Sequence, residues 1–430
     1  MNKRLALLTA AVVALGVTGC APSGGPDATT DPGATPEVLV WTDSVREPAA
    51  KAYKEAVKGE VDVTIEVVDV ADLPTKIALF NTTGSGWPDV VFAQPNDVAA
   101  WADPSNGYAA DLTDLVDPAV FEAYNGANDW CLIDDKFYCL KNDLAQSVLW
   151  YDAPLMEELG LSVPTTMDEF ATEAMKLEGT GYVAGAIGDQ NFYSSYLWPS
   201  GCPMAETLDQ STVRIAPEAV ECTRVSELVQ PLVDAKVLDT RSSFDAGFLA
   251  DVAQKGKVVM TLGPSWFGEF VLKPESSWAI PAGHVAAAPM PIWDGNDKAY
   301  SGEWGGGIWV VSSHAKFPEA AAEAATFLST DVEVMAASVT FPGSGPAFEA
   351  WAERISGDEY YASDIVPALV EQATLINPTE RPVRYANQAQ IGAVLQTEIN
   401  AGAPIADAVV AFQESLIQLA PGSGYKVVEE

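Results

Sequence analysis

Early in the chain, short apolar runs alternate with amphipathic stretches, and this alternation restricts the fold more than any other feature. Residues 38–41 and 89–92 are apolar runs, and 61–68 alternates apolar and polar residues as a half-buried strand does. Helical stretches at 47–57 and 74–80 separate these three segments. A strand–helix–strand–helix–strand order is typical of a parallel sheet with helical crossovers. We therefore predict an α/β fold.

In such sheets ligands bind outside the carboxyl ends of the strands. Asp43 and Ser44 follow the first predicted strand, and Gln94 and Asn96 follow the third. We expect these four side chains to contact a ligand. The alternative is that these residues only form a turn or an N-cap of a helix, because both favour the same residue types.

The rest of the chain continues the mixture of strands and helices. Strands are predicted at 147–151, 258–262 and 305–311, and helices at 168–177, 217–233, 318–328, 388–400 and 404–419. Roughly 390 residues follow residue 37, too many for one core at about 100–200 residues per domain. Since 48% of all residues are hydrophobic, we predict two well-packed domains.

The N-terminus has the pattern of an export signal. Lys3 and Arg4 precede an apolar stretch at 5–17, and small residues come before Cys20. The apolar stretch is shorter than the roughly 20 residues that span a bilayer. The residues before Cys20 resemble a bacterial lipobox, so we predict a signal peptide at 1–19 and a lipidated Cys20. Residues 20–37, rich in Pro, Gly, Ser and Thr, would tether the protein to the outer face of the cytoplasmic membrane.

Four cysteines follow Cys20, and export makes disulfides permissible. Cys131 and Cys139 flank two short strand-like runs joined by an Asp-Asp-Lys turn, which could place them opposite one another in a hairpin. Cys202–Cys222 then follows by elimination among three possible pairings. A four-cysteine metal site is the alternative, but the CxxC spacing is absent.

The charge and the motifs exclude several function classes. A formal net charge of −37 argues against nucleic-acid partners and against adsorption on anionic lipid. His284 and His314 are the only histidines, and neither lies in a metalloprotease or triad-like motif. No GxSxG or P-loop motif is present. We expect a protein that is not an enzyme and has neither metal nor cofactor. A secreted glycosidase with paired carboxylates is the enzyme alternative.

Four segments occur in an order that resembles the family 1 extracellular solute-binding proteins, which include the maltose-binding protein. The segments are 134–160, 164–170 (PTTMDEF, with Met167 in place of the usual tryptophan), 248–266 (FLADVAQKGKVVMTLGPSW), and 283–291 together with 302–311. The resemblance covers roughly 38–419. Each motif alone is weak evidence for the family. The resemblance rests on the order that the four segments share with it.

The resemblance implies two α/β lobes of the periplasmic-binding-protein type, with a ligand cleft between them and a hinge that the chain crosses more than once. The first lobe would take 38–142 plus 304–340, and the second 143–303 plus 341–420. It also implies a monomer that captures a carbohydrate, an oligosaccharide in preference to a single sugar, and delivers it to the permease of an ABC importer. The alternatives are another solute, such as a polyamine, amino acid, peptide or metal chelate, and a surface adhesin.

Sugars need planar hydrogen-bonding groups for their hydroxyls and aromatic surfaces for their C–H faces. By resemblance, the residues that would contact the ligand are Trp266, Asp143, Asn142, Tyr193 (with Phe192 and Tyr196 as rivals), Arg384 and Asn387. Glu303 and Trp304 precede the Gly305–Gly307 turn at a predicted crossing, where glycines let the backbone approach a ligand closely.

Overall fold

The computed structural model describes residues 34–429, so the predicted signal peptide and Cys20 lie outside the described residues. A five-stranded sheet in the order β2-β1-β3-β13-β6 forms the first lobe. Strand β1 (Glu37–Thr42) pairs in parallel with β2 (Asp62–Val67) and with β3 (Val90–Ala93), which confirms the predicted parallel arrangement. Strand β13 (Ile308–Val311) is antiparallel to both β3 and β6 (Leu140–Lys141).

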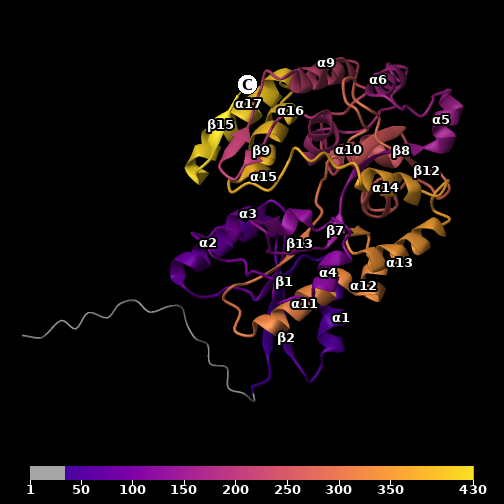
Figure 1. The fold of residues 1–430 in the computed structure, drawn as a ribbon. Coiled ribbons are helices and arrows are strands. Elements are labelled where there is room, and N and C mark those ends of the chain that lie inside the picture. Colours follow the sequence, from indigo (N-terminus) through magenta and orange to yellow (C-terminus); the bar gives the residue numbers. More distant parts are fainter. Residues whose placement is uncertain (1–33, 430) are drawn as a thin grey trace, which may run out of the picture. The chain divides into compact units, whose positions relative to one another are not determined.

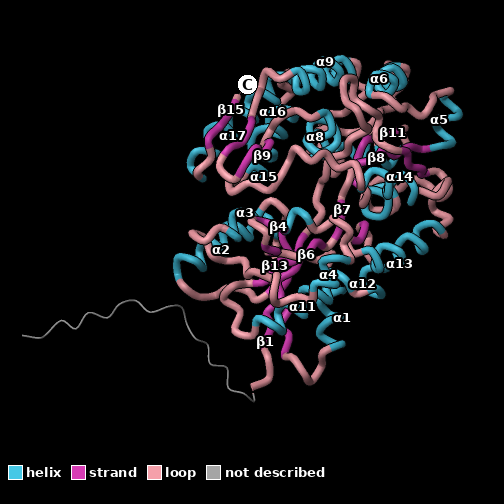
Figure 2. The backbone as a smooth tube through the Cα atoms, viewed as in Figure 1, coloured by secondary structure: helices cyan, strands magenta, loops and turns pink. Residues whose placement is uncertain are grey.

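Helices lie against this sheet (Figure 2), and they bury apolar side chains there. Helix α1 (Glu47–Ala56) begins with a proline near its N-terminus and buries Ala50 and Tyr53. Helix α11 (Pro318–Thr330) buries five alanines, which favour the helix and let it approach β13 closely. Helix α2 (Leu73–Thr83) ends at Gly84, whose left-handed φ of 73° is the usual helix stop.

The second lobe is built around strand β8 (Ser147–Asp152), which pairs antiparallel with β11 (Met260–Pro264) and β12 (Val285–Ala288). A smaller sheet has the order β15-β10-β9. Its strands are β9 (Glu206–Asp209), β10 (Thr212–Arg214) and β15 (Lys426–Val428).

The other helices are mostly short. They are α3 (Asp97–Ala102), α4 (Pro118–Glu122), α5 (Ala153–Leu159), α6 (Met167–Met175), α7 (Gln190–Phe192), α8 (Trp198–Ser200), α9 (Val220–Asp234), α10 (Ala246–Asp251), α12 (Val332–Ala336), α13 (Gly345–Ser356), α14 (Val366–Ala373), α15 (Asn387–Gln390), α16 (Thr397–Asn400) and α17 (Ile405–Leu419) (Figure 1). Three segments are π-helical, at Tyr193–Leu197, Gly268–Leu272 and Ile391–Gln396. Such segments are frequent at functional sites. None of the described helices is long and apolar enough to cross a membrane.

The chain passes between the two lobes near residues 142–146, 302–307 and 338–342. At the first passage, β7 (Asp143–Leu144) pairs antiparallel with β14 (Phe341–Pro342), which belongs to the third. At the second passage, Trp304 N donates to the carbonyl of Ala145 at 3.1 Å. The passages are therefore hydrogen-bonded to one another. The exact lobe boundaries remain a prediction.

Both predicted disulfides are present. Cys131–Cys139 closes the hairpin of β4 (Leu132–Ile133) and β5 (Lys136–Phe137), with Cα atoms 5.0 Å apart. The turn residues Asp134 and Asp135 have φ of 52° and 61°, which two-residue hairpin turns require.

The second disulfide joins Cys202 to Cys222 on α9, with Cα atoms 4.6 Å apart. It fastens the loop after α8 to that helix.

We expect each disulfide to contribute about 2–4 kcal/mol to the free energy of unfolding, because a crosslink restricts the unfolded chain. Double Cys→Ser variants of each pair, unfolded in urea, would measure this. A reductant should lower the stability of the native protein. It should not change the stability of a variant in which all four of these cysteines are replaced by serine. Equal effects of reductant on the two proteins would contradict the expectation.

Candidate ligand-binding site

A cavity of about 200 Å³ lies at the carboxyl ends of strands from both lobes. Asp43 follows β1, Gln94 follows β3, and Trp266 follows β11. The residues that line it are Asp43, Val45, Arg46, Phe92, Gln94, Asp143, Gln190, Trp266, Phe270, Trp304, Gly305, Gly306, Gly307, Val339 and Thr340. The structure thus brings five of the predicted residues together, namely Asp43, Gln94, Asp143, Trp266 and Trp304.

Arg46 forms ion pairs with both carboxylates of the cavity. Its guanidinium lies 3.0 Å from Asp43 Oδ2 and 3.1 Å from Asp143 Oδ1. Asp43 also accepts the backbone N–H of Arg46 at 2.8 Å, which fixes the turn that leads into α1. The guanidinium lies 4.3 Å from the centre of the Phe92 ring. The result is a preorganised polar surface with hydrogen-bond acceptors and a donor group, held against an aromatic ring.

The other side of the cavity is aromatic. The Trp266 ring lies edge-on to Trp304, with ring centres 5.2 Å apart, and its Nε1 donates to the Trp304 carbonyl at 2.7 Å. Phe270 lies 5.9 Å from Trp266. These flat, apolar rings opposite the polar cluster suit a ligand with both C–H faces and hydroxyls.

Gln190 is a cavity residue that the sequence analysis missed. Its Nε2 is buried and has no hydrogen-bond partner in the protein. The residue lies at the start of α7, where Asp189 accepts the backbone N–H of Asn191 at 3.0 Å. A buried, unpaired donor costs free energy unless a ligand or water accepts from it. The Asp-Gln-Asn N-cap pattern was visible in the sequence, but its proximity to Trp266 was not.

Arg46 and Phe270 were also missed. Arg46 follows Ser44 by two residues, so the expectation that residues after a strand contact the ligand identified the correct segment. Phe270 lies in the π-helical segment Gly268–Leu272, whose widened turn no residue pattern predicted.

The glycine turn before β13 packs closely against side chains of the protein itself. A Cβ on Gly306 would lie 2.7 Å from Glu303 Oε1, and one on Gly307 would lie 2.0 Å from the Phe92 ring. Gly305 and Gly306 have φ of 98° and 73°. Glycine is required here because the backbone approaches side chains of the protein itself, in addition to lining the cavity.

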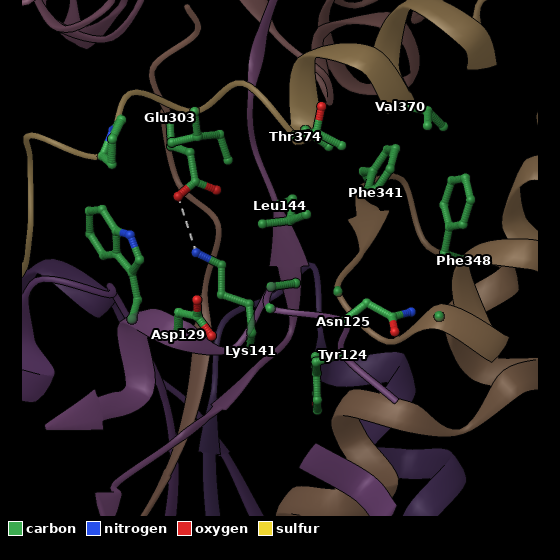
Figure 3. Close-up of a pocket in the computed structure, with 18 of the residues that line it drawn as sticks. Tyr124, Asn125, Asp129, Lys141, Leu144, Glu303, Phe341, Phe348, Val370 and Thr374 are labelled. Carbon is green, nitrogen blue, oxygen red and sulfur yellow. Dashed lines mark hydrogen bonds and ion pairs between the residues drawn. The ribbon is translucent and has the colours of Figure 1, made fainter. Parts of the chain in front are cut away.

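A larger groove of about 610 Å³ lies on the other side of the chain passages (Figure 3). Lys141, Leu144 and Glu303 line the groove, whereas their neighbours Asp143 and Trp304 line the cavity. Asp143 and Leu144 are successive residues, as are Glu303 and Trp304, and successive residues of an extended chain point to opposite faces, which explains how these two pairs divide. We place the candidate site in the smaller cavity because the strands end there and because it holds the unpaired donor of Gln190.

Glu303, predicted to contact the ligand, forms a buried ion pair in the groove instead. Its Oε2 lies 3.2 Å from Lys141 Nζ, and the two side chains are 3% and 1% exposed. Its Oε1 accepts the backbone N–H of Ala145 at 3.1 Å. Figure 3 shows the two charged groups facing each other across the passages. Both carboxylate oxygens are therefore engaged within the protein.

Two more predicted residues have structural partners outside the cavity. Asn142 donates to Asp143 Oδ1 at 2.7 Å and accepts from Trp309 Nε1 at 2.9 Å, so it orients a cavity residue without lining the cavity. Tyr193 is buried in the second lobe and donates to Glu380 Oε2 at 2.9 Å. Burial raises the pKa of Glu380 to about 7. The rivals of Tyr193, Phe192 and Tyr196, are also buried in that core.

The remaining predicted residues also lie outside the cavity lining. Ser44 and Asn96 do not line the cavity, although Asp43, Val45 and Gln94 near them in the chain do. Arg384 lies 3.7 Å from Asp103 and covers the Tyr425 ring at 4.3 Å, and Asn387 is buried at the start of α15. Within residues 34–429, no group of three or more His, Cys, Asp or Glu side chains could hold a metal ion.

Comparison with known proteins identifies the class. The sequence model of the bacterial extracellular solute-binding proteins matches residues 40–335, and the chain belongs to this family. The fold agrees with solved structures of sugar-binding proteins of ABC transporters. No match was found among curated protein sequences.

Two of these structures come from bifidobacteria. The galacto-N-biose/lacto-N-biose I-binding protein of Bifidobacterium longum has a TM-score of 0.75 at 18% identity, and the match covers 93% of this chain and 100% of that one. A binding protein of B. animalis subsp. lactis in complex with β-1,6-galactobiose has a TM-score of 0.73 at 21% identity, covering 92% and 100%. The sugar-binding protein MalE of Xanthomonas citri has a TM-score of 0.68 at 15% identity, covering 90% and 98%.

Replacing Lys141 with methionine should lower the free energy of unfolding by about 3–5 kcal/mol, because the Glu303 carboxylate would remain buried without a cation. A Lys141→Met/Glu303→Gln double variant should recover part of this loss. Urea unfolding of the set measures both values.

Lys58→Met is the matched control, since its ion pair with Glu55 is exposed. We expect it to change stability by less than about 1 kcal/mol. Similar losses for Lys58→Met and Lys141→Met, or a double variant less stable than Lys141→Met, would refute the role given to the buried pair.

Proposed function

We propose that the protein is the substrate-binding component of an ABC importer and that it captures a carbohydrate in the cavity between its lobes. The observation that supports this most is the presence, in one cavity, of aromatic rings together with an ion-paired polar cluster. Trp266, Trp304 and Phe270 offer apolar faces to a sugar ring, and Arg46, Asp43 and Asp143 offer donors and acceptors to its hydroxyls. Closure of two lobes over such a ligand excludes water from it.

The similar structures support the same class of ligand. Those from bifidobacteria are described with lacto-N-biose and β-1,6-galactobiose, and both belong to ABC transporters. At this sequence identity the particular sugar does not transfer to this chain.

A polyamine is the alternative solute, but the ion pairs already formed in the cavity disfavour it. Arg46 pairs with both Asp43 and Asp143, so the cavity offers no unpaired carboxylate to a cation. A neutral, hydroxyl-rich ligand leaves these ion pairs in place. For the same reason two free catalytic carboxylates, which a glycosidase needs, are not found at this site.

Binding can be tested by a thermal-shift screen of residues 37–430 against mono-, di- and oligosaccharides, with spermidine and amino acids for comparison. A ligand that binds only the folded protein raises its stability in proportion to ln(1 + [L]/Kd). We expect the largest shift with a sugar. A shift with spermidine or an amino acid alone would contradict the proposal.

Gln190→Ala should weaken sugar binding about 3- to 10-fold, because one hydrogen bond to the ligand is lost, while the melting temperature without ligand hardly changes. Its amide nitrogen has no partner in the protein, so little folding energy depends on it. Calorimetric titration measures the affinity. Gln254→Ala, at an exposed position on the second lobe, is the control and should leave binding unchanged. An unchanged affinity of Gln190→Ala would remove Gln190 from the site.

We further propose that Cys20 carries a lipid anchor at the outer face of the cytoplasmic membrane, that residues 21–37 are its tether, and that the protein acts as a monomer delivering its ligand to a permease. The lobes would comprise 38–142 plus 304–340, and 143–303 plus 341–420. The position of Cys20 after an export-type apolar stretch supports the anchor.

Cys20→Ser should abolish lipidation, because the thiol is the atom that would be acylated. In a bacterial host given radiolabelled palmitate, we expect label on the native chain only, and release of the variant into the medium. Label on both proteins, or on neither, would refute the anchor.

A further inference from the structure

The larger groove, on the side of the chain passages away from the cavity, has two unlike ends. Figure 3 shows the apolar side chains of Phe341, Phe348 and Val370 together at one end, and the charged side chains of Asp129 and Lys141 towards the other. The volume of about 610 Å³ lies within the roughly 300–1,000 Å³ of typical small-ligand pockets. The groove therefore has the size of a ligand site and an amphipathic lining.

The charged end of the groove contains an arginine without a partner. Arg381 lines this groove and also a neighbouring groove of about 480 Å³, which shares Asp129 and Trp130 with it. Arg381 therefore lies towards the Asp129 end. Every other arginine of residues 34–429 forms a hydrogen bond or an ion pair, whereas Arg381 forms neither with the described part of the chain. The N–H donors of its guanidinium are available to a ligand.

The other charges at this end are already paired or solvated. Lys141 and Glu303 form the buried ion pair described above. Asp129 forms no ion pair within residues 34–429, but it is exposed, so water solvates its carboxylate. Arg381 is only partly exposed, so its cation is less well solvated. An anionic group is the complement that it lacks, and a guanidinium binds a carboxylate through two parallel hydrogen bonds.

The segment that carries Arg381 is fixed by its neighbours. The buried carboxylate of Glu380, one residue earlier, accepts the hydroxyl of Tyr193 at 2.9 Å. The backbone N–H of Asn377 donates to the carbonyl of Ser301 at 2.8 Å. A ligand would not have to order this backbone, which reduces the entropic cost of binding.

The other end of the groove suits a hydrocarbon chain. The rings of Phe341 and Phe348 are stacked with their centres 4.7 Å apart. Val370 and Ala373, on helix α14, add aliphatic surface, and Val370 is 37% exposed. Each CH₂ group of a ligand that such a surface removes from water should tighten binding by about 3- to 4-fold.

We propose that this groove is a second binding site, separate from the sugar cavity, for an amphiphilic carboxylate such as a short fatty acid. Arg381 holds the carboxylate, and the hydrocarbon chain lies against Phe341, Phe348 and Val370. A formal net charge of −37 repels small anions in general, so binding at this site depends on Arg381. The inference goes beyond the proposed sugar-binding function and does not depend on it.

Isothermal titration of the native protein with acetate, butanoate, hexanoate and the neutral analogue hexanamide tests the site. Affinity should rise by about 3- to 4-fold with each added CH₂ group of the carboxylates. Hexanoate should bind about 10-fold more tightly than hexanamide, because only the carboxylate forms charge-assisted hydrogen bonds. Arg381→Gln should weaken hexanoate binding to the level of hexanamide. Asp129→Asn should not weaken it, because the substitution removes a like charge.

Lys298→Gln removes an exposed cation outside both grooves and is the matched control, so it should leave hexanoate binding unchanged. Arg381→Gln should keep the native melting temperature and sugar affinity, since Arg381 has no partner in the described chain and does not line the cavity. No binding of hexanoate, equal binding of hexanoate and hexanamide, or an unchanged hexanoate affinity of Arg381→Gln would overturn the second site and leave the proposed function intact. Hexanoate binding without any sugar binding would contradict the proposed function alone.

Discussion

The buried ion pair between Lys141 and Glu303 holds together the passages on which the site depends. Lys141 belongs to β6 of the first sheet, and Glu303 belongs to the segment that returns to that sheet from the second lobe. Their neighbours Asp143 and Trp304 supply polar and aromatic groups to the cavity. Breaking such a pair leaves a charge in a dry interior, which is costly, so its geometry is strongly maintained. One interaction behind the cavity thereby fixes the backbone from which two of its side chains extend.

Two groups of cavity side chains are held in place by contacts within the protein, without a ligand. Arg46 satisfies Asp43 and Asp143, and Trp266 is fixed by its hydrogen bond to the Trp304 carbonyl. Among the residues that line the cavity, only Gln190 has a buried side-chain donor without a partner in the described part of the protein. A preorganised site loses little conformational entropy on binding, so contact energy appears more fully as affinity.

Much of the candidate site could be predicted from the sequence wherever a residue follows a strand. Asp43 and Gln94 were placed in this way, because the ends of strands in such sheets converge, whereas Trp266 and Asp143 were expected from the family resemblance. Gln190, Arg46 and Phe270 were missed since their positions depend on a helix N-cap, on a pairing across the lobes and on a π-helical turn. Glu303 was predicted to contact ligand, but neighbouring residues of an extended passage face opposite sides, and the sequence does not tell which residue faces which side.

The sequence by itself determined the α/β class, the parallel start of the first sheet and the pairing of four cysteines. These features follow from local patterns: hydrophobic period, turn residues and the short spacing of Cys131 and Cys139. Only the tertiary structure decided that β13 returns antiparallel between β3 and β6, that Lys141 finds Glu303, and that Phe244 lies against Trp266. Those contacts join residues far apart in the chain, and they exist because two lobes pack around shared passages, which no local pattern encodes.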